Sequence, residues 1–255
     1  MEIVQKFLTK NNCFLAAVPL IPKGIMVHST AVRGAMAKNF LSSWNVPKPN
    51  NISVCVHGFL DNTGFYQTLP WNYKGWHAGG SANNKLIGFE ICEPSNYSDK
   101  VYFNNVKQRA IDICVFLCRK YNWSADVITT HCEGYQRYGS SYASNHGDIH
   151  HWWKVYHGYT ISDFRKDVQK ELDRLKEIEV DEKMLQEYIN KYGEDIVRAG
   201  LTKIFETEKN KNITSSWAEK ELKEAIDAGI TDGTRPQDTA TRQEVAIMVK
   251  RGAKK

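Results

Sequence analysis

Histidines and carboxylates gather in one stretch in the middle of this chain. The segment from Thr129 to Trp153 holds four of the eight histidines, and in it His131 is followed well downstream by His146 and Asp148. Neutral imidazole and carboxylate groups are good ligands for a divalent metal such as zinc. The segment is rich in Gly, Ser, Tyr and Asn, and its polar groups lack helical or strand spacing. We therefore expect an ordered loop that carries function.

A hydrolytic zinc site would need more groups than this segment offers. Such a site has three protein ligands and one open position, where the metal lowers the pKa of a water molecule and polarises a carbonyl. Hydrolysis also needs a base for the water and a donor or cation for the oxyanion. The residues that could fill these roles are His28, His131 and Asp148 as ligands, Glu90 as the base, and His146 as the oxyanion stabiliser or acid.

Glu90 is conspicuous because its neighbours are apolar. It lies in the run KLIGFEIC from Lys85 to Cys92, which has the composition of a buried strand. A carboxylate in such a place costs free energy unless it is paired or functional. Burial would also raise its pKa toward the range that a general base needs.

Each of these residues also has a purely structural interpretation. His28 alone could be a hydrogen-bonded core histidine, Asp148 a turn or cap residue, and Glu90 the partner of an Arg or Lys. The remaining histidines of the region are interpreted as structural: His150 and His151 as packing or rim residues before two tryptophans, and His157 as a surface residue. Only the combination favours a metal site.

The elements that would position these groups alternate between strands and helices. Short apolar runs predict strands, and apolar residues at helical spacing predict helices. The expected strands are Lys23–Thr30, Asn51–Leu60, Gly64–Leu69, Lys85–Cys92 and Asp126–Thr130; the expected helices are Asn105–Tyr121 and one marked by Ile161, Phe164, Val168, Leu172 and Leu175. This order predicts an α/β domain over residues 1–175.

The composition limits the class of protein. With 255 residues, 42% hydrophobic and 25% charged, the chain suits one large domain or a medium and a small one. The formal net charge of +5 is too weak to identify an anionic partner. No apolar run approaches the ~20 residues of a membrane span, and no secretory signal is visible. The six cysteines, without a C-x-x-C pair, are expected to be small buried hydrophobes of a protein made in a reducing cytosol.

Beyond about Glu179 charges dominate the sequence, and residues 176–255 are expected to form a small all-α module. One or two helices are expected over Asp181–Gly200. Two capping boxes, at Ser216–Glu219 and Thr241–Glu244, predict short helices, the first ending at Gly229. So small a unit is expected to dock on the preceding helices or on a second copy of the chain, as in a homodimer.

Five motifs in order resemble one enzyme family. They are VHST, WHAGG at Trp76–Gly80, IGFE at Ile87–Glu90, THCE at Thr130–Glu133 and NHGD at Asn145–Asp148. Together they are similar to the zinc-dependent N-acetylmuramoyl-L-alanine amidases of the amidase_2 group, which includes T7-lysozyme-like enzymes and peptidoglycan recognition proteins. The resemblance spans about Lys23 to Arg165 and is closest to phage and prophage endolysins of Gram-positive hosts. It implies a central mixed sheet flanked by helices, with zinc in an open groove.

The resemblance also implies roles for individual residues. The family's ligands match His28, His131 and Asp148, its substrate-polarising position matches His146, and its catalytic glutamate matches Glu90. Val56 stands where other members carry a catalytic tyrosine, so Glu90 must carry the base role. Ile149 follows Asp148 where the family usually has proline. The residues expected to contact the substrate are His57, Trp76, His77 and Tyr135, with Trp71 and Tyr138 as further aromatic surfaces for sugars.

The implied substrate is the amide between N-acetylmuramic acid and L-alanine, cleaved by zinc-activated water. The run GI-x-x-G…RP-x-D-x-x-TR-x-E in the tail resembles one S-layer-homology repeat, which implies binding to a wall-associated polymer. An endolysin of this kind would be made in the host cytoplasm without a signal peptide and would act at the bacterial cell wall after release.

Two alternatives remain open at this point. A peptidoglycan-binding protein of the same fold that has lost catalysis would usually lack a zinc ligand, whereas all three positions are filled here. A zinc nuclease is suggested by NHGDIHH, but only Arg137 and Lys154 lie around the expected site, and nucleic-acid binding is not expected.

Overall fold

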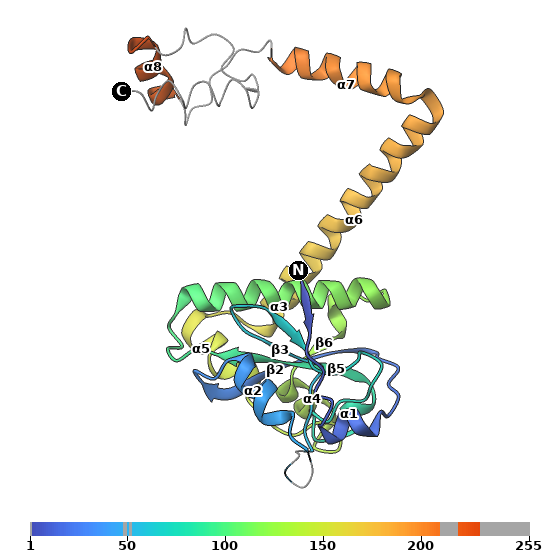
Figure 1. Ribbon diagram of the computed structural model, residues 1–255, viewed down its shortest axis with the longest axis vertical. Helices are drawn as coiled ribbons and strands as arrows, with labels where there is room; N and C mark the ends of the chain where they lie inside the picture. The colour runs from blue at the N-terminus through green and yellow to red at the C-terminus, as the bar shows by residue number, and fades with distance from the viewer. Residues whose placement is uncertain (1, 48–49, 51–52, 210–218, 230–255) are drawn as a thin grey trace. The chain divides into compact units, whose positions relative to one another are not determined.

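A computed structural model describes residues 2–47, 50, 53–209 and 219–229. Its centre is a mixed sheet of six strands in the order β1-β4-β3-β5-β2-β6 (Figure 1). The strands are β1 (Ile3–Gln5), β2 (Gly24–Arg33), β3 (Gly58–Leu60), β4 (Phe65–Gln67), β5 (Leu86–Glu93) and β6 (Ile128–Thr129). Parallel pairing joins β3, β5, β2 and β6, and the antiparallel hairpin β3–β4 reverses direction before β1. The predicted mixed sheet flanked by helices is confirmed.

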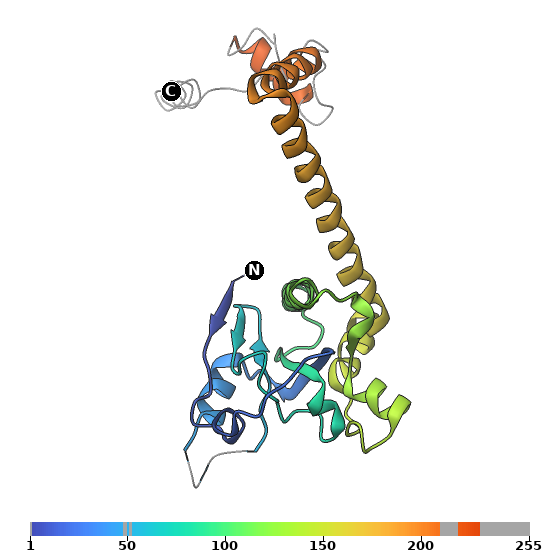
Figure 2. The same cartoon turned by 90° about the vertical axis from the view of Figure 1, so that its right-hand side faces the viewer.

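The described residues also form eight α-helices and three short 3₁₀ turns. The helices are α1 (Asn12–Ala16), α2 (Ala37–Trp44), α3 (Lys100–Tyr121), α4 (His131–Tyr138), α5 (Trp153–His157), α6 (Ile161–Tyr192), α7 (Glu194–Lys209) and α8 (Glu219–Asp227). The turns are η1 (Ser81–Asn84), η2 (Ala125–Val127) and η3 (Asp148–His151). Figure 2 shows α3 end-on beside one face of the sheet.

The two faces of the sheet have different chemistry because side chains alternate along each strand. Ile25 and Val27 of β2 face the main core, where residues from β5, α3 and α6 also meet. Met26 and His28 face the opposite side, where Met26 packs with small residues of η1 and the segment after α4. One face is therefore an apolar core, and the other is free to carry the polar site.

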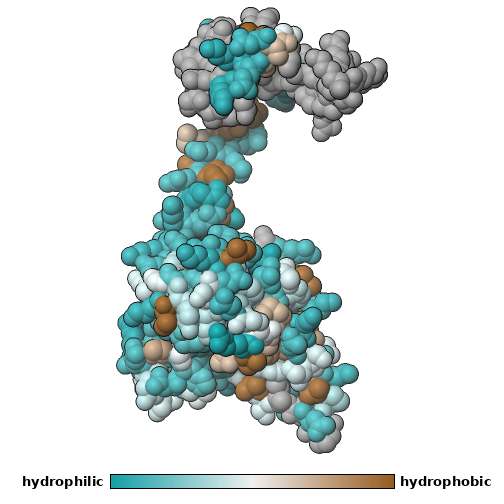
Figure 3. Space-filling view, turned by 90° about the vertical axis from the view of Figure 1, so that its left-hand side faces the viewer, coloured by the Kyte–Doolittle hydropathy of each residue, from teal (hydrophilic) through white to brown (hydrophobic). Residues whose placement is uncertain are grey.

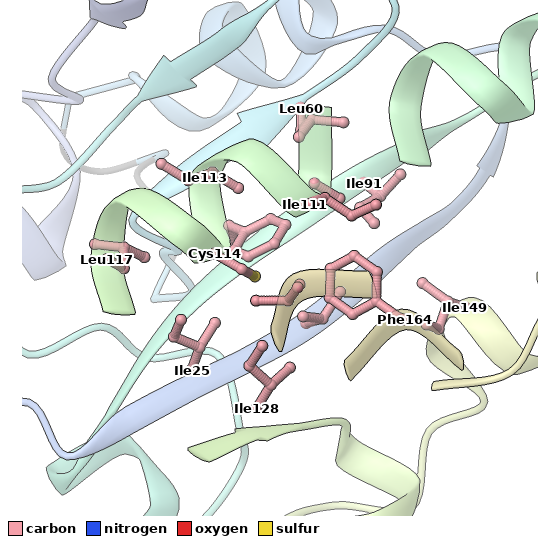
Figure 4. Close-up of a cluster of buried hydrophobic side chains, with 14 of the residues drawn as sticks. Ile25, Leu60, Ile91, Ile111, Ile113, Cys114, Leu117, Ile128, Ile149 and Phe164 are labelled. Carbon is pink, nitrogen blue, oxygen red and sulfur yellow. The ribbon is translucent and has the colours of Figure 1, made fainter. Parts of the chain in front are cut away.

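The main core depends on α3 lying across the sheet. Asp99 caps this helix by accepting hydrogen bonds from the backbone of Val101 and Tyr102, and Asn122 ends it in a left-handed conformation. In Figure 4 the side chains of α3, β2, β5 and the start of α6 converge on the labelled Cys114 and Phe164. The apolar packing between α3 and the sheet therefore fixes the positions of the ends of β2 and β5.

Several elements differ from the sequence predictions. The predicted strand Asn51–Leu60 is reduced to β3 from Gly58, with Asn51 and Ile52 outside the described residues. Most of Asp126–Thr130 is the 3₁₀ turn η2 followed by the two-residue strand β6. The prediction of a loop from Thr129 to Trp153 is wrong in part, because α4, η3 and α5 begin within it. Thr130 accepts a hydrogen bond from the backbone of Glu133, which starts α4 as a capping-box threonine does.

The cysteines are free thiols. Cys13, Cys55, Cys92, Cys114 and Cys118 are buried, and Cys132 is partly exposed. This confirms the interpretation of the cysteines as small apolar side chains for all but Cys132.

The chain forms two compact units, Met1–Ile178 and Glu179–Lys255. The boundary falls inside α6, which continues well past the predicted end near Leu175. The expected helices over Asp181–Gly200 are the last part of α6 and the first part of α7. Helix α8 ends just before Gly229, whose φ of +67° is left-handed, as predicted. Ser216 and the second capping box at Thr241–Glu244 lie outside the described residues.

The face of the first unit that Figure 3 shows is mostly hydrophilic. On the side that Figure 3 shows, apolar residues lie singly or in small groups among hydrophilic ones. Within the described ranges, no helix has the length and apolar character needed to cross a membrane.

Replacing Phe164 by Ala should destabilise the first unit strongly. The ring is completely buried and packs at 5.6 Å from the ring of Trp153. The cavity left behind should lower the free energy of unfolding by about 3–5 kcal/mol. Urea unfolding followed by tryptophan fluorescence measures this change. Lys170→Ala, at an exposed position of the same helix within the first unit, is the control and should change it by roughly 0.5 kcal/mol or less.

Candidate active site

Three potential metal ligands converge on the polar face of the sheet. His28 lies on β2, His131 is the first residue of α4, and Asp148 is the first residue of η3. Nδ1 of His28 lies 3.1 Å from Nδ1 of His131, and Oδ1 of Asp148 lies 3.5 Å from the His28 atom and 3.2 Å from the His131 atom. All three side chains are buried. Residues far apart in the sequence thus present three donor atoms to one point.

The start of α4 holds two of these ligands together. The backbone N–H of His131 donates to Oδ2 of Asp148 at 2.6 Å, which leaves Oδ1 directed at the histidines. A carboxylate at a helix N-terminus also meets the positive end of the helix dipole. Burial alone would raise the pKa of Asp148, but its close contacts with His131 and His28 hold that pKa well below its usual range. Asp148 is therefore an anion here.

The donor set fits a tetrahedral divalent cation. Ligand atoms at ~2.0–2.1 Å from such an ion would be separated from one another by roughly 3.3 Å. The observed separations of 3.1, 3.2 and 3.5 Å bracket that value. Burial lowers the pKa of His28 below its ordinary value, which keeps the ring neutral as a ligand must be. Two neutral imidazoles and one carboxylate are a donor set that zinc accepts.

Glu90 lies beside this cluster because of strand register. Residue 90 of β5 is paired with His28 of β2 in parallel alignment, so both side chains project from the same face. Oε2 of Glu90 is buried and has no hydrogen-bond partner. Burial, with the nearby charges of Asp148 and Glu93, raises its pKa to about 8. A carboxyl group with this pKa can take up and release a proton near neutral pH.

His146 borders the cluster from the solvent side. Its ring centroid lies 4.8 Å from that of His131, and its side chain is exposed. The structure therefore brings together all five residues that the sequence suggested for catalysis and metal binding, namely His28, Glu90, His131, His146 and Asp148.

The residues expected to contact the substrate are placed less uniformly. Tyr135 is 36% exposed on α4, whereas His57 has no exposed surface and bonds to the backbone of Tyr73 and Gly88. Trp76 packs, partly exposed, against a cluster around Cys55. His77 is partly exposed and lies against His28. Their roles in substrate binding stay predictions.

A buried carboxylate that sequence reasoning missed anchors the Asp148 turn. Glu93 is completely buried at the end of β5 and accepts hydrogen bonds from Ser29 Oγ at 2.6 Å and Tyr97 OH at 2.5 Å. His151 Nε2 lies 2.9 Å from it. Trp152 Nε1 donates to Ser29 Oγ at 3.0 Å. These bonds fasten η3 to the ends of β2 and β5. The interpretation of His151 as a rim residue therefore leaves out its contact with Glu93, for which the sequence holds no signal.

The position after Asp148 is filled by a core residue. Ile149 is buried in the main core, and Asp148 itself has a left-handed φ of +45°. Aspartate tolerates this conformation better than most residues. Burial of Ile149 thus sets the direction of the turn at the place where the sequence lacks the expected proline.

These features define a class of protein. A mixed sheet that carries one histidine and a glutamate of raised pKa, with a second histidine and an aspartate held beside them by α4 and η3, is an arrangement that could hold a divalent metal ion and carry out hydrolysis. Comparison with known protein families identifies the family to which the chain belongs. The model of the amidase_2 family, described as N-acetylmuramoyl-L-alanine amidase, matches residues 19–150. Because this match covers more than half of the chain, the chain belongs to the amidase_2 family.

Individual relatives agree with the family match. The N-acetylmuramoyl-L-alanine amidase CwlH of Bacillus subtilis is 38% identical over 99 residues, which are 36% of this chain and 38% of that protein. Endolysin 2638A of Staphylococcus phage 2638A is 26% identical over 148 residues, 55% of this chain and 29% of that protein. The chain thus matches only about a third of the length of these relatives.

A solved structure supports the fold over the first unit. The catalytic domain of XlyA, an amidase of Bacillus subtilis, superposes with a TM-score of 0.51 at 26% identity. The match covers 66% of this chain and 99% of that domain.

The raised pKa of Glu90 predicts a pH-dependent stability of the metal-free protein. The native state holds this proton more tightly than the unfolded chain, so unfolding releases it between the ordinary pKa of 4.5 and about 8. Its contribution to stability is therefore complete below pH 4.5 and is lost as the pH rises toward 8. Glu90→Gln should remove this loss. Urea unfolding in the presence of a chelator at pH 5, 6.5 and 8 measures it, and equal pH dependence in both proteins would contradict the assignment.

Proposed function

We propose that this protein is a zinc-dependent N-acetylmuramoyl-L-alanine amidase that acts on bacterial peptidoglycan, as a cell-wall-degrading endolysin does. The observation that carries the proposal is the convergence of His28, His131 and Asp148 beside the unpaired carboxyl of Glu90. The names of the matched amidases and of the phage endolysin support the choice of bond.

His28, His131 and Asp148 would hold the zinc. Zinc in this position would supply a Lewis acid that lowers the pKa of a water molecule and polarises the substrate carbonyl. Two neutral ligands and one anion leave the occupied site with a net positive charge, which favours an oxyanion. This positive charge would also lower the pKa of Glu90 from its metal-free value.

Glu90 would act as the general base. Its carboxylate takes a proton from the attacking water as the water oxygen forms a bond to the carbonyl carbon. The same proton then passes to the nitrogen of L-alanine as the carbon–nitrogen bond breaks, so the products are a free carboxylate on the lactyl group and a free amine. A group of raised pKa suits both halves of this transfer.

His146 would orient the substrate. It is the exposed member of the cluster, so a carbonyl arriving from solvent meets it before the buried ligands. A hydrogen bond from its ring to the carbonyl oxygen would strengthen as negative charge develops there. The exposed ring of Tyr135, on the same helix as His131, offers an apolar face to the sugar or peptide.

A non-catalytic peptidoglycan-binding protein of the same fold is the other candidate. It is disfavoured because the site keeps three ligands and a glutamate whose Oε2 is buried without a hydrogen-bond partner. An unpaired carboxyl costs free energy and has no structural use, whereas a base needs one.

Glu90→Gln should abolish most turnover and leave zinc binding intact. Loss of a general base typically lowers kcat by about 10²–10⁴-fold, and the isosteric amide keeps the volume of the side chain. Mass spectrometry of digested wall fragments measures free L-alanine termini, with zinc content determined in parallel. Glu171→Gln, on the surface of α6, is the control and should be fully active. No release of L-alanine termini by the wild type from any Gram-positive wall, or release that survives a chelator, would contradict the proposal.

The second unit would carry the cell-wall-binding function. We propose that residues 176–255 form a helical module for a wall-associated polymer, as the resemblance of the tail to an S-layer-homology repeat implies. The described helices leave apolar side chains exposed, among them Met184, Leu185, Tyr188, Ile196 and Ile204. Figure 3 shows such residues recurring along α6. A surface of this kind needs a cover, and a homodimer or docking of the tail residues would provide it.

Deletion of residues 179–255 should separate binding from hydrolysis. Cleavage of soluble muropeptides should stay within about twofold of the full-length rate, because the site lies wholly in the first unit. Sedimentation with intact walls should fall strongly. Equal sedimentation of both proteins would show that the second unit has no role in wall binding.

A further inference from the structure

The ring of His77 lies directly behind the metal ligand His28. Nδ1 of His77 is 2.8 Å from Nε2 of His28, and the two rings meet edge to face with centroids 4.9 Å apart. The other nitrogen of His28, Nδ1, is the one directed at His131 and Asp148. His28 therefore stands between the metal site and His77, with one ring nitrogen for each.

The hydrogen bonds fix which nitrogen carries each proton. Nε2 of His77 lies 3.2 Å from the carbonyl oxygen of Leu86, which can only accept. A neutral His77 must therefore carry its single proton on Nε2, and its Nδ1 is an acceptor. Nε2 of His28 then donates to that acceptor, and Nδ1 of His28 keeps a free lone pair for the metal. The hydrogen bonds that run from the Leu86 carbonyl through His77 to His28 therefore select one tautomer of His28.

Strand β5 is built to hold His77 in this place. A Cβ atom at Gly88 would lie 2.4 Å from Nδ1 of His77, so the ring occupies space that only glycine leaves open. The side-chain oxygen of Asn83 accepts hydrogen bonds from the backbone of His77 and Ala78 at 2.9 Å and 2.8 Å. Leu86 and Gly88 lie on the same strand as Glu90. One strand thus carries the carbonyl acceptor, the space for the ring and the proposed base.

We propose that His77 is a positioning residue, which fixes the tautomer and the ring orientation of His28 and so raises the affinity of the site for zinc. The proposal rests on the proposed zinc-dependent function. Partners of this kind behind a ligating histidine typically change metal affinity by about 10–100-fold. It differs from the expectation that His77 lines the substrate groove, because a groove residue would change KM and leave metal affinity as it is.

The tautomer of His28 can be read in the wild-type protein without zinc. Long-range ¹H–¹⁵N NMR distinguishes protonated from unprotonated ring nitrogens. We expect His28 and His77 both to carry the proton on Nε2. A proton on Nδ1 of His28 would overturn the proposal whatever the activity of the enzyme.

Two substitutions at His77 test the effect on the metal. His77→Leu removes the acceptor and should weaken zinc binding by about 10–100-fold in competition with a chromophoric chelator. His77→Asn can place an amide oxygen near the position of Nδ1 and should restore affinity to within a few-fold of the wild type. Far-UV circular dichroism and thermal unfolding show that both variants are folded, and the comparison between them keeps the result independent of a general loss of stability. Lys170→Gln, at an exposed position of α6, is the control.

The outcomes separate this proposal from the proposed function. If the wild type binds zinc and cleaves peptidoglycan while His77→Leu binds zinc as tightly as the wild type, the positioning role is wrong and the amidase function stands. A variant with a raised KM and unchanged zinc affinity would also overturn the positioning role, in favour of substrate contact. A wild type that binds no zinc would overturn both.

Discussion

The parallel register of β2 with β5 is the constraint on which the site depends. It pairs His28 with Glu90, and because side chains alternate, it sends the apolar neighbours of both residues into the core on the other face. A shift of one residue in either strand would bury a charged group in that core and expose a large apolar side chain. The apolar packing under α3 therefore enforces the position of the base relative to the first ligand. The hydrophobic effect, acting on one face, positions catalytic groups on the other.

Burial then gives these groups their chemistry. Removal from water disfavours a charge on His28 and on Glu90, so the histidine stays neutral and the carboxyl has a raised pKa. Asp148 differs because hydrogen bonds from His131 stabilise its anion. Two carboxyl groups close together thus have opposite protonation preferences, which suits one to the metal and the other to proton transfer.

Sequence reasoning succeeded where a pattern is local and failed where it depends on three-dimensional contact. The apolar runs of β2 and β5 and the spacing of α3 were predictable, and so were the five residues that meet in the site. Helix α4 was missed, although Thr130 and Glu133 have the spacing of a capping box, because the glycines and tyrosines beyond them favoured a loop. The strand before Leu60 was predicted too long, since an apolar run does not reveal where a neighbouring strand stops pairing. The roles of Glu93 and His77 could not be read at all, because they depend on which atoms face each other across β2, β5 and η3.

Asp148 and Ile149 are neighbours in the chain but belong to different environments. One contributes an oxygen to the proposed metal site, and the other fills a place in the apolar core. With a single peptide bond between them, neither side chain can be displaced without moving the other. A change in the packing around Ile149 therefore also changes the position of the Asp148 carboxylate relative to the two histidine ligands. Metal content would then serve as a gauge of how well the interior is packed, even for substitutions that lie far from any ligand.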